Sequence, residues 1–363
     1  MSDNIAFYKQ TDRDNINKVR EILKSMPTFC NDYFRSIERH TATRTQVAYA
    51  QDLTIFFQFL REYNPLLKDL SQKDITLNNL EQLTILDMEE YIQYLKLYRS
   101  KNSGKEYSNS NTGIDRKIAS LKSFFNFLNR TEMIKYNPPA RIQLSKKIDK
   151  EIVYLDPDEV ALLLDEVEFG YSRNKSNKAR LAHERLKVRD LALITLMLGT
   201  GIRISECVGL DITDVDFKNC AILVHRKGGK EATIYFGEEV EDALKKYIKQ
   251  RVTMSPQEGH ENALFLSSQR KRLNICSVEA IVKKYASAIA PLKKITPHKL
   301  RSTYGTSLYR ETSDIYLVAD VLGHSDVNIT KKHYSAIEQD RRRNIRNIVK
   351  LREHPSSDDK YEE

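Results

Sequence analysis

The sequence predicts two domains: an all-α first domain, and a mainly α second domain with a small antiparallel β-sheet (α+β). Three observations support this prediction. The chain has 363 residues, enough for two or three hydrophobic cores. Apolar residues recur at helical spacing along much of it. Two β-rich runs, 221–226 and 231–236, flank the sequence Lys-Gly-Gly-Lys, which is typical of a hairpin turn.

The composition narrows the class of protein. Lys and Arg outnumber Asp and Glu by 59 to 50, so the net charge is +9, which weakly favours a polyanionic partner. The four cysteines form no CxxC pair, and we expect neither a disulfide framework nor a zinc site. No apolar run has the length of a membrane span, and the polar, acidic start differs from a secretory signal. These features predict a soluble, cytoplasmic protein.

The first part of the chain is expected to be helical. We predict a helical arm over residues 1–40 and a helical domain over residues 41–137. Apolar positions at helical spacing predict individual helices over 12–24, 43–63, 87–98 and 114–128. The polar, Gly- and Ser-containing stretch 100–113 is predicted to be a loop.

Four basic residues of this domain lie away from the apolar helix faces: Arg44, Arg116, Lys117 and Lys122. A solvated helix face is the simpler interpretation. Contact with DNA phosphates is the alternative, and it gains weight only if the second domain acts on DNA.

A basic linker is predicted over residues 138–155, because Pro138 and Pro139 end the preceding helix and apolar residues are few. The second domain is predicted over residues 156–350, followed by a disordered tail, 351–363. It opens with Asp156 and Pro157, a helix cap and a first-turn proline.

The second domain contains a buried apolar helix, 187–199, that runs into the sequence GTGIRISE. Its glycines permit a sharp turn, which would hold Arg203 at the start of the next helix. Glu206 lies one helical turn further on and can accept a hydrogen bond from that guanidinium. Read alone, Arg203 could also be an ordinary surface arginine at a helix start.

Further cationic side chains follow. Lys227 and Lys230 lie at the tip of the predicted hairpin, where either a solubilising role or proton donation is possible. His298 and Arg301 share a helix face after Thr296-Pro297, although a buried structural histidine is the plainer interpretation of His298.

A Leu-Gly-His turn then supplies His324, and Tyr334 follows ten residues later. Cationic donors followed by one phenol provide the groups needed to attack a phosphodiester and to stabilise the charge that develops. The predicted clusters include no group of carboxylates that would hold a metal.

GTGIRISE, RKGGKE, HKLRSTYGT and LGHSDVNIT, with the tyrosine that follows, resemble the signature boxes of the tyrosine recombinase (phage integrase) family. The first helical domain resembles the SAM-like core-binding domain of that family. MPTFCNDYF, HRKGGKEATI and ITPHKLRSTYGTSLY resemble its Xer-type members in streptococci. The resemblance covers nearly the whole chain and implies a C-shaped clamp around DNA.

The resemblance also implies roles for single residues. The catalytic set is Arg203, Lys227, His298, Arg301, His324 and the nucleophile Tyr334, with Glu206 in support. In the family, the lysine that Lys227 matches acts as general acid toward the leaving 5′ oxygen. Two features depart from the common pattern: Ser302 stands where a histidine is usual, and ten residues, rather than nine, separate His324 from Tyr334.

The implied activity is site-specific recombination through a 3′-phosphotyrosine intermediate and a Holliday junction, without metal, ATP or cofactor. The implied partner is double-stranded DNA with an inverted-repeat site. Four copies would assemble on it through a C-terminal helix, 336–354, with a DNA translocase or an excisionase as a possible accessory protein.

Several functions stay open at this point. The recombinase could resolve chromosome dimers during chromosome partition and cell division, or it could be the integrase of a phage or conjugative transposon. A type IB topoisomerase shares the chemistry, and a DNA-binding regulator could have lost it. The intact catalytic set argues against the regulator, and the two-domain clamp with its C-terminal helix favours recombination over relaxation.

Overall fold

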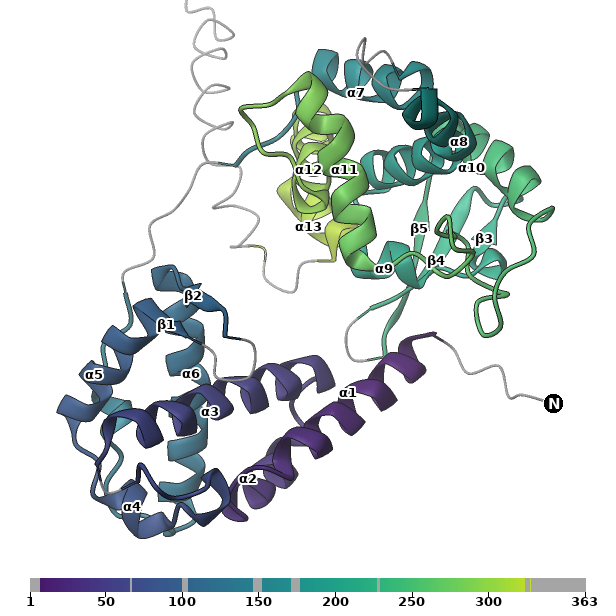
Figure 1. Cartoon of the computed structure of the whole chain (residues 1–363). Helices are drawn as coiled ribbons and strands as arrows, with labels where there is room; N and C mark the ends of the chain where they lie inside the picture. Colours follow the sequence, from purple (N-terminus) through teal and green to yellow (C-terminus); the bar gives the residue numbers. More distant parts are fainter. Residues whose placement is uncertain are drawn as a thin grey trace, which may run out of the picture. The chain divides into compact units, whose positions relative to one another are not determined.

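The computed structural model describes residues 7–65, 67–99, 104–145, 152–170, 177–226, 229–323 and 327. The chain divides into two compact units, Met1–Asp149 and Lys150–Glu363 (Figure 1). The division between the units falls inside the predicted linker, 138–155. The finer domain limits stay a prediction.

The first unit is built from helices, as predicted. Their bounds are α1 (Phe7–Leu23), α2 (Phe29–Ile37), α3 (Thr43–Tyr63), α4 (Leu77–Glu81), α5 (Ile85–Lys96) and α6 (Asn111–Arg130), with 3₁₀ turns η1 (Gln72–Asp74) and η2 (Pro138–Arg141). Helix α1 packs along α3 (Figure 1). Helix α5 begins where Thr84 and Asp87 cap each other's backbone N–H groups, which satisfies two donors of its first turn.

Aromatic rings form the core of this unit. Phe56 and Phe57 of α3 and Phe124 and Phe125 of α6 are fully buried. Tyr33 of α2 packs edge-on against Phe124, with ring centroids 5.2 Å apart. Such pairs add about 0.5–1.5 kcal/mol each beyond the area they bury. Phe56 packs against Phe125 with ring centroids 5.9 Å apart, and Phe57 packs against Phe124 at 6.3 Å, so these rings hold α3 and α6 together.

A small sheet lies where a loop was predicted. Strand β1 (Leu97–Arg99) pairs antiparallel with β2 (Glu106–Ser108), and Tyr98 lies opposite Tyr107. The two tyrosine rings stack with centroids 5.6 Å apart. The prediction of loop for 100–113 is therefore wrong for residues 106–108, where cross-strand ring packing outweighs the loop-like composition. It is also wrong for the start of α6, where the side chain of Ser110 caps the helix by accepting a hydrogen bond from the backbone N–H of Gly113.

The second unit combines helices with one sheet. Its helices are α7 (Pro157–Phe169), α8 (Asn177–Thr200), α9 (Ile204–Gly209), α10 (Glu238–Arg251), α11 (Ile275–Ile289), α12 (Pro297–Thr312) and α13 (Ile315–Leu322), with the 3₁₀ turn η3 (Ile212–Asp214). Its strands are β3 (Val215–Asp216), β4 (Ala221–His225) and β5 (Glu231–Tyr235). Helix α7 begins at Pro157, as Asp156 and Pro157 predicted.

Helix α8 forms the centre of this unit. Its segment 192–197 is largely buried on all sides, because α7, α10 and α12 pack around the helix (Figure 1). The sequence predicted the helix over 187–199, whereas it begins at Asn177. Its first turns are rich in charged residues, so a search for apolar residues at helical spacing did not detect them.

The three strands form an antiparallel sheet in the order β3-β4-β5. Strands β4 and β5 make the predicted hairpin, in which Ala221 pairs with Tyr235 and His225 pairs with Glu231. The two-residue strand β3 was not predicted. Across the described ranges, no helix is both long and apolar enough to cross a membrane.

Candidate active site

Arg203 lies at the N-cap of α9, directly after a turn that requires glycine. Gly201 has a φ of +61°, and a Cβ atom there would lie 2.4 Å from Cδ1 of Tyr304. The backbone N–H of Arg203 donates to Oε2 of Glu206 at 2.9 Å, and its Nη1 donates to Oε1 at 2.9 Å. The buried Glu206 carboxylate therefore fixes both the backbone and the guanidinium of Arg203.

Arg301, on α12, is buried, with only 5% of the residue exposed. Its Nη1 donates to the carbonyl oxygen of Gly201 at 2.5 Å, and its Nη2 donates to the carbonyl oxygen of Leu322. The side chain thus joins the turn before Arg203 to the end of α13. A buried guanidinium needs such acceptors, because a buried donor without one costs free energy.

Arg226 is a third arginine of this cluster, and sequence reasoning missed it. It follows β4, and its Nη2 donates to the carbonyl oxygen of Val321 at 3.4 Å. Its Nε lies 3.9 Å from Oε1 of Glu206. The box RKGGKE contains it, but only its neighbour Lys227 matched a family role.

The three guanidinium groups meet at the C-terminus of α13. Among the described residues, Arg226, Arg301 and Arg203 donate to the successive carbonyls of Val321, Leu322 and Gly323. The last carbonyls of a helix lack intrahelical partners and carry the negative end of its dipole. Cationic donors therefore stabilise this helix end, and the helix end in turn brings the arginines together.

His298 lies in the first turn of α12 and is exposed. Its carbonyl oxygen accepts a hydrogen bond from Oγ of Ser302, 3.1 Å away. Helix α12 places His298 one turn before Arg301, and only the histidine faces solvent. Lys227, His324 and Tyr334 lie outside the described residues.

The four basic residues predicted to contact DNA lie on the first unit in different surroundings. Arg44, in the first turn of α3, is exposed. Arg116 forms two hydrogen bonds to the buried carboxylate of Asp52, at 2.6 and 2.7 Å. Arg116 is thus held by an internal partner. Its DNA contact, like that of the other three, stays a prediction.

Lys117 and Lys122 also have internal acceptors. Nζ of Lys117 donates to Oδ1 of Asn109 at 2.8 Å, and Nζ of Lys122 donates to the carbonyl oxygen of Ile142 at 2.7 Å. Lys117 is only 7% exposed, and this burial lowers its pKa. The interpretation as a solvated helix face is therefore wrong for Lys117, because α6 is covered on more than one side.

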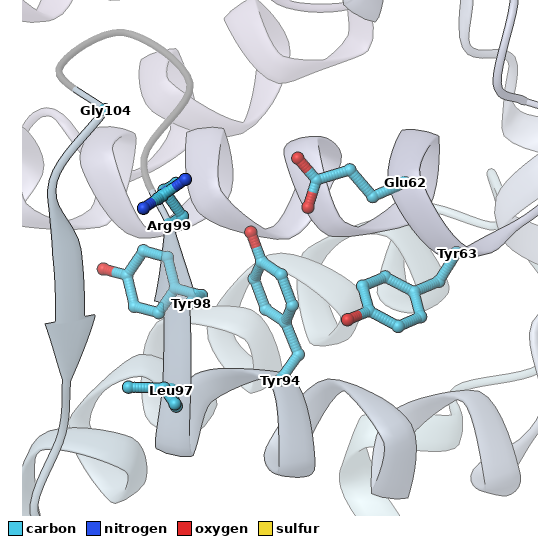
Figure 2. A pocket seen from close by; sticks show the side chains of 7 residues that line it. All are labelled: Glu62, Tyr63, Tyr94, Leu97, Tyr98, Arg99 and Gly104. Carbon is cyan, nitrogen blue, oxygen red and sulfur yellow. The ribbon is translucent and has the colours of Figure 1, made fainter.

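A pocket of about 470 Å³ lies in the first unit and contains none of the predicted catalytic residues (Figure 2). Its lining consists of Glu62, Tyr63, Tyr94, Leu97, Tyr98, Arg99 and Gly104. The phenol oxygen of Tyr94 points toward Glu62 in Figure 2, and burial raises the pKa of that phenol. This pocket belongs to the unit Met1–Asp149, whereas the arginine cluster belongs to the unit Lys150–Glu363.

The arginine cluster can bind an anion. The side chain of Arg203 is 39% exposed although its hydrogen bonds fix its position, and His298 is exposed. Fixed guanidinium groups can form forked hydrogen bonds to phosphate oxygens. Within the described ranges, no group of three or more His, Cys, Asp or Glu side chains could hold a metal ion.

The Phage integrase family matches residues 154–341, more than half of the chain. The chain belongs to this family. The family predicted from the signature boxes is therefore confirmed, and the chain is a tyrosine recombinase. The family's match begins two residues before the predicted second domain.

Relatives of this tyrosine recombinase extend over both units. Tyrosine recombinase XerS of Streptococcus uberis (strain ATCC BAA-854 / 0140J) is 32% identical over 360 residues, which cover 91% of this chain and 97% of the relative. XerS of Streptococcus thermophilus (strain CNRZ 1066) is 30% identical, and the matched residues cover 92% of this chain and 98% of that relative. The predicted likeness to Xer-type members in streptococci is confirmed.

Solved recombinase structures share the fold. XerH bound to its palindromic difH substrate in a post-cleavage complex has a TM-score of 0.62 at 19% identity, covering 92% of this chain and 89% of that one. The Tn1549 transposon integrase in complex with circular intermediate DNA has a TM-score of 0.58 at 22% identity. The match covers 87% of this chain and 99% of the integrase chain. The predicted fold class, two mainly helical domains with a small antiparallel sheet in the second, is confirmed, and the β1–β2 sheet is an addition to the first domain, which was predicted to be all-α.

Proposed function

We propose that this tyrosine recombinase cuts and rejoins DNA at a specific inverted-repeat site through a 3′-phosphotyrosine intermediate formed by Tyr334. The observation that supports the proposal most directly is the arginine cluster. Arg203 and Arg301 reach one helix end from segments far apart in sequence, and that helix leads directly to His324. In this proposal the first unit binds DNA and the second unit carries the chemistry.

Cleavage begins with attack of the Tyr334 oxygen on the scissile phosphorus. A phenol has a pKa of about 10 and needs nearby positive charge or a base to act at neutral pH. Arg203 and Arg301 bind the non-bridging oxygens and stabilise the charge of the pentacoordinate transition state. His298 and His324 complete the set of donors around that phosphate. Glu206 keeps the Arg203 guanidinium oriented.

Lys227 donates a proton to the leaving 5′ oxygen. The phenol of Tyr334 gives up its proton to solvent, and its bond to phosphorus forms while the bond to the 5′ oxygen breaks, so the bond energy of the cut strand is kept. A 5′ hydroxyl of a partner strand can then reverse the step and restore the backbone. Strand exchange by this route passes through a Holliday junction and consumes no ATP.

We further propose a Xer-type role, the resolution of chromosome dimers during chromosome partition, in the cytoplasm. Its support is the 30–32% identity to XerS proteins over at least 91% of this chain. Four copies would act together on DNA, joined through the segment 336–354, and a DNA translocase could regulate them. The integrase of a mobile element shares the chemistry, and it differs in where on a genome it acts.

Covalent capture of DNA tests both the recombination chemistry and the Xer-type role. Genomic DNA of the source organism is incubated with the protein, the reaction is stopped with detergent, and DNA fragments joined to protein are sequenced. We expect covalent fragments from one inverted-repeat chromosomal site, formed with chelator present and without ATP. Fragments from the ends of a mobile element would contradict the Xer-type role, and a failure to form any covalent fragment would contradict the recombination chemistry.

A further inference from the structure

We propose that Arg226 is a positioning residue, which fixes the base of the β4–β5 hairpin against the end of α13 and thereby sets where Lys227 delivers its proton. The inference deepens the proposed function and rests on it, because it takes Lys227 as the general acid. Arg226 is not itself assigned contact with the reacting atoms.

The backbone of Arg226 closes the hairpin. Its N–H donates to the carbonyl oxygen of Lys230 at 2.6 Å, one step beyond the pair His225–Glu231. Lys227 is its covalent neighbour on the other side. In this proposal the placement of Arg226 therefore limits where the next residue in the sequence, Lys227, can act.

The side chain of Arg226 ties this closed base to α13. Its Nη2 donates to the carbonyl oxygen of Val321 at 3.4 Å. Its guanidinium lies so close to Gly323 that a Cβ atom there would lie 2.3 Å from Nη1 and 2.6 Å from Cζ. The absence of a side chain at Gly323 thus makes room for the guanidinium. The contact joins the residue before Lys227 to the residue before His324.

The same guanidinium approaches the carboxylate that orients Arg203. Nε of Arg226 lies 3.9 Å from Oε1 of Glu206, which also accepts from Nη1 of Arg203 at 2.9 Å. The Arg226 side chain is 20% exposed and the Glu206 side chain 4%, so solvent screens this attraction less than it would at the surface. A lysine at position 226 would supply a single point charge instead of a fork and could not reproduce both contacts.

Geometry of this kind matters for proton transfer. A misplacement of about 1 Å can cost a factor of about 10² in rate. A short two-stranded hairpin is a weak support when it stands alone. The tie through Arg226 connects the hairpin base to a helix end that two further arginines already hold.

A sulfur atom in place of the leaving 5′ oxygen separates proton delivery from phosphate binding. Thiols, with a pKa of about 8.5, are far stronger acids than alcohols and leave as thiolates without a proton. The bond from Tyr334 to phosphorus still forms and the phosphorus–sulfur bond breaks. A defect in proton delivery should therefore disappear on the sulfur substrate, while a defect in binding the phosphate should persist.

The experiment measures single-turnover covalent adduct formation by the full-length chain. The substrates are nicked duplexes of the captured site with oxygen or sulfur at the scissile 5′ position. The variants are Arg226→Met, Arg226→Lys, Lys227→Ala and Arg203→Ala. Arg251→Met serves as a matched control, because Arg251 is another buried arginine that donates to two backbone carbonyls, those of Ala263 and Glu261, away from α13.

We expect Arg226→Met to slow cleavage of the oxygen substrate about tenfold or more, which is part of the factor of about 10²–10⁴ that a well-placed general acid contributes. Both Arg226 variants and Lys227→Ala should then cleave the sulfur substrate at a rate near that of the unaltered protein. Arg203→Ala should remain slow on both substrates, and Arg251→Met should change the two rates by the same factor.

Two results would separate the failure of this inference from that of the proposed function. If sulfur rescues Lys227→Ala but neither Arg226 variant, Arg226 does not position the lysine and the inference is overturned. Arg226→Lys covers the case in which Arg226→Met fails to fold, because it keeps the charge and most of the stem. If sulfur fails to rescue Lys227→Ala, the general-acid role in the proposed function is wrong.

Discussion

Arg203 donates a hydrogen bond from Nη2 to the carbonyl oxygen of Gly323, 2.9 Å away and 120 positions later in the chain. The bond connects the start of α9 to the residue that precedes His324. Arg301 holds the preceding carbonyl, that of Leu322. The protein's own backbone therefore positions both guanidinium groups, which is the kind of preorganisation that electrostatic catalysis requires.

Replacing Tyr334 by Phe should abolish covalent adduct formation and leave DNA binding unchanged, because the change removes one oxygen atom, the proposed nucleophile. The measurement uses a duplex nicked beside the scissile phosphate, on which cut strands stay joined to the protein, together with a gel-shift assay. Tyr316→Phe is the matched control, since Tyr316 is an exposed tyrosine of α13. Adducts formed by Tyr334→Phe would show that another residue attacks.

Replacing Gly201 by Ala should destabilise the second unit by about 1–3 kcal/mol and slow cleavage. The new Cβ would meet Tyr304 at 2.4 Å and Leu322 at 3.0 Å, and the Gly201 carbonyl holds Arg301. Gly259→Ala is the control, because Gly259 also has a positive φ, +79°, but has open space around it. Urea unfolding and adduct formation are measured on both variants. Equal losses of stability in Gly201→Ala and Gly259→Ala would contradict the steric argument.

The sequence predicted those parts of the site that depend on particular side chains at a fixed spacing along the chain. Arg203 and Glu206 lie one turn apart, and the GTG turn before them needs glycine, so their meeting could be expected. The role of α13 could not, because its acceptors are backbone carbonyls, which every residue carries. Arg226 was missed for the same reason, since its importance lies in the carbonyl and the glycine that it contacts.

Removing the guanidinium of Arg116 should destabilise the first unit by about 1–3 kcal/mol, less than for a fully buried pair, because Arg116 is half exposed. Burial raises the pKa of Asp52, and Arg116 partly offsets the rise. In Arg116→Met that pKa should rise further. Stability contributed by Asp52 is then fully present below the ordinary aspartate pKa of about 3.9 and is lost as the pH rises through the raised value.

Urea unfolding of Arg116→Met across this pH range should therefore show stability falling as the pH rises toward neutral. Adding Asp52→Asn should remove that pH dependence and recover part of the lost stability, since the amide carries no charge to bury. If the double variant keeps the same pH dependence as Arg116→Met, another group is responsible.

Replacing Arg44 by Ala should weaken DNA binding without changing the free energy of unfolding, because Arg44 is exposed at the start of α3. If Arg44 neutralises one phosphate, the slope of log affinity against log salt should fall in magnitude by about 1. Binding is measured by fluorescence anisotropy over a series of salt concentrations. An unchanged slope would assign Arg44 to the solvated surface.

The first unit shows why basic residues are hard to interpret from sequence. Arg44, Arg116 and Lys117 were predicted alike, but Arg116 is paired with Asp52 and Lys117 is buried. Their partners come from distant positions, and helical periodicity reports only one face of α6. The aromatic core could be predicted because its residues recur at helical spacing within single helices. Strands β1 and β2 could not, because they depend on ring contacts across a loop.

Arg203, Arg226 and Arg301, with Glu206 and the carbonyls of residues 321–323, all belong to the unit Lys150–Glu363. The contacts to which we assign the bond-breaking chemistry are thus encoded in one continuous portion of the gene. If the first unit selects the DNA, as the proposed function has it, mutations in the other portion should alter that choice and leave these contacts unchanged. A chimera that joins this unit to the first unit of a relative should therefore acquire the relative's target preference and keep its own reaction.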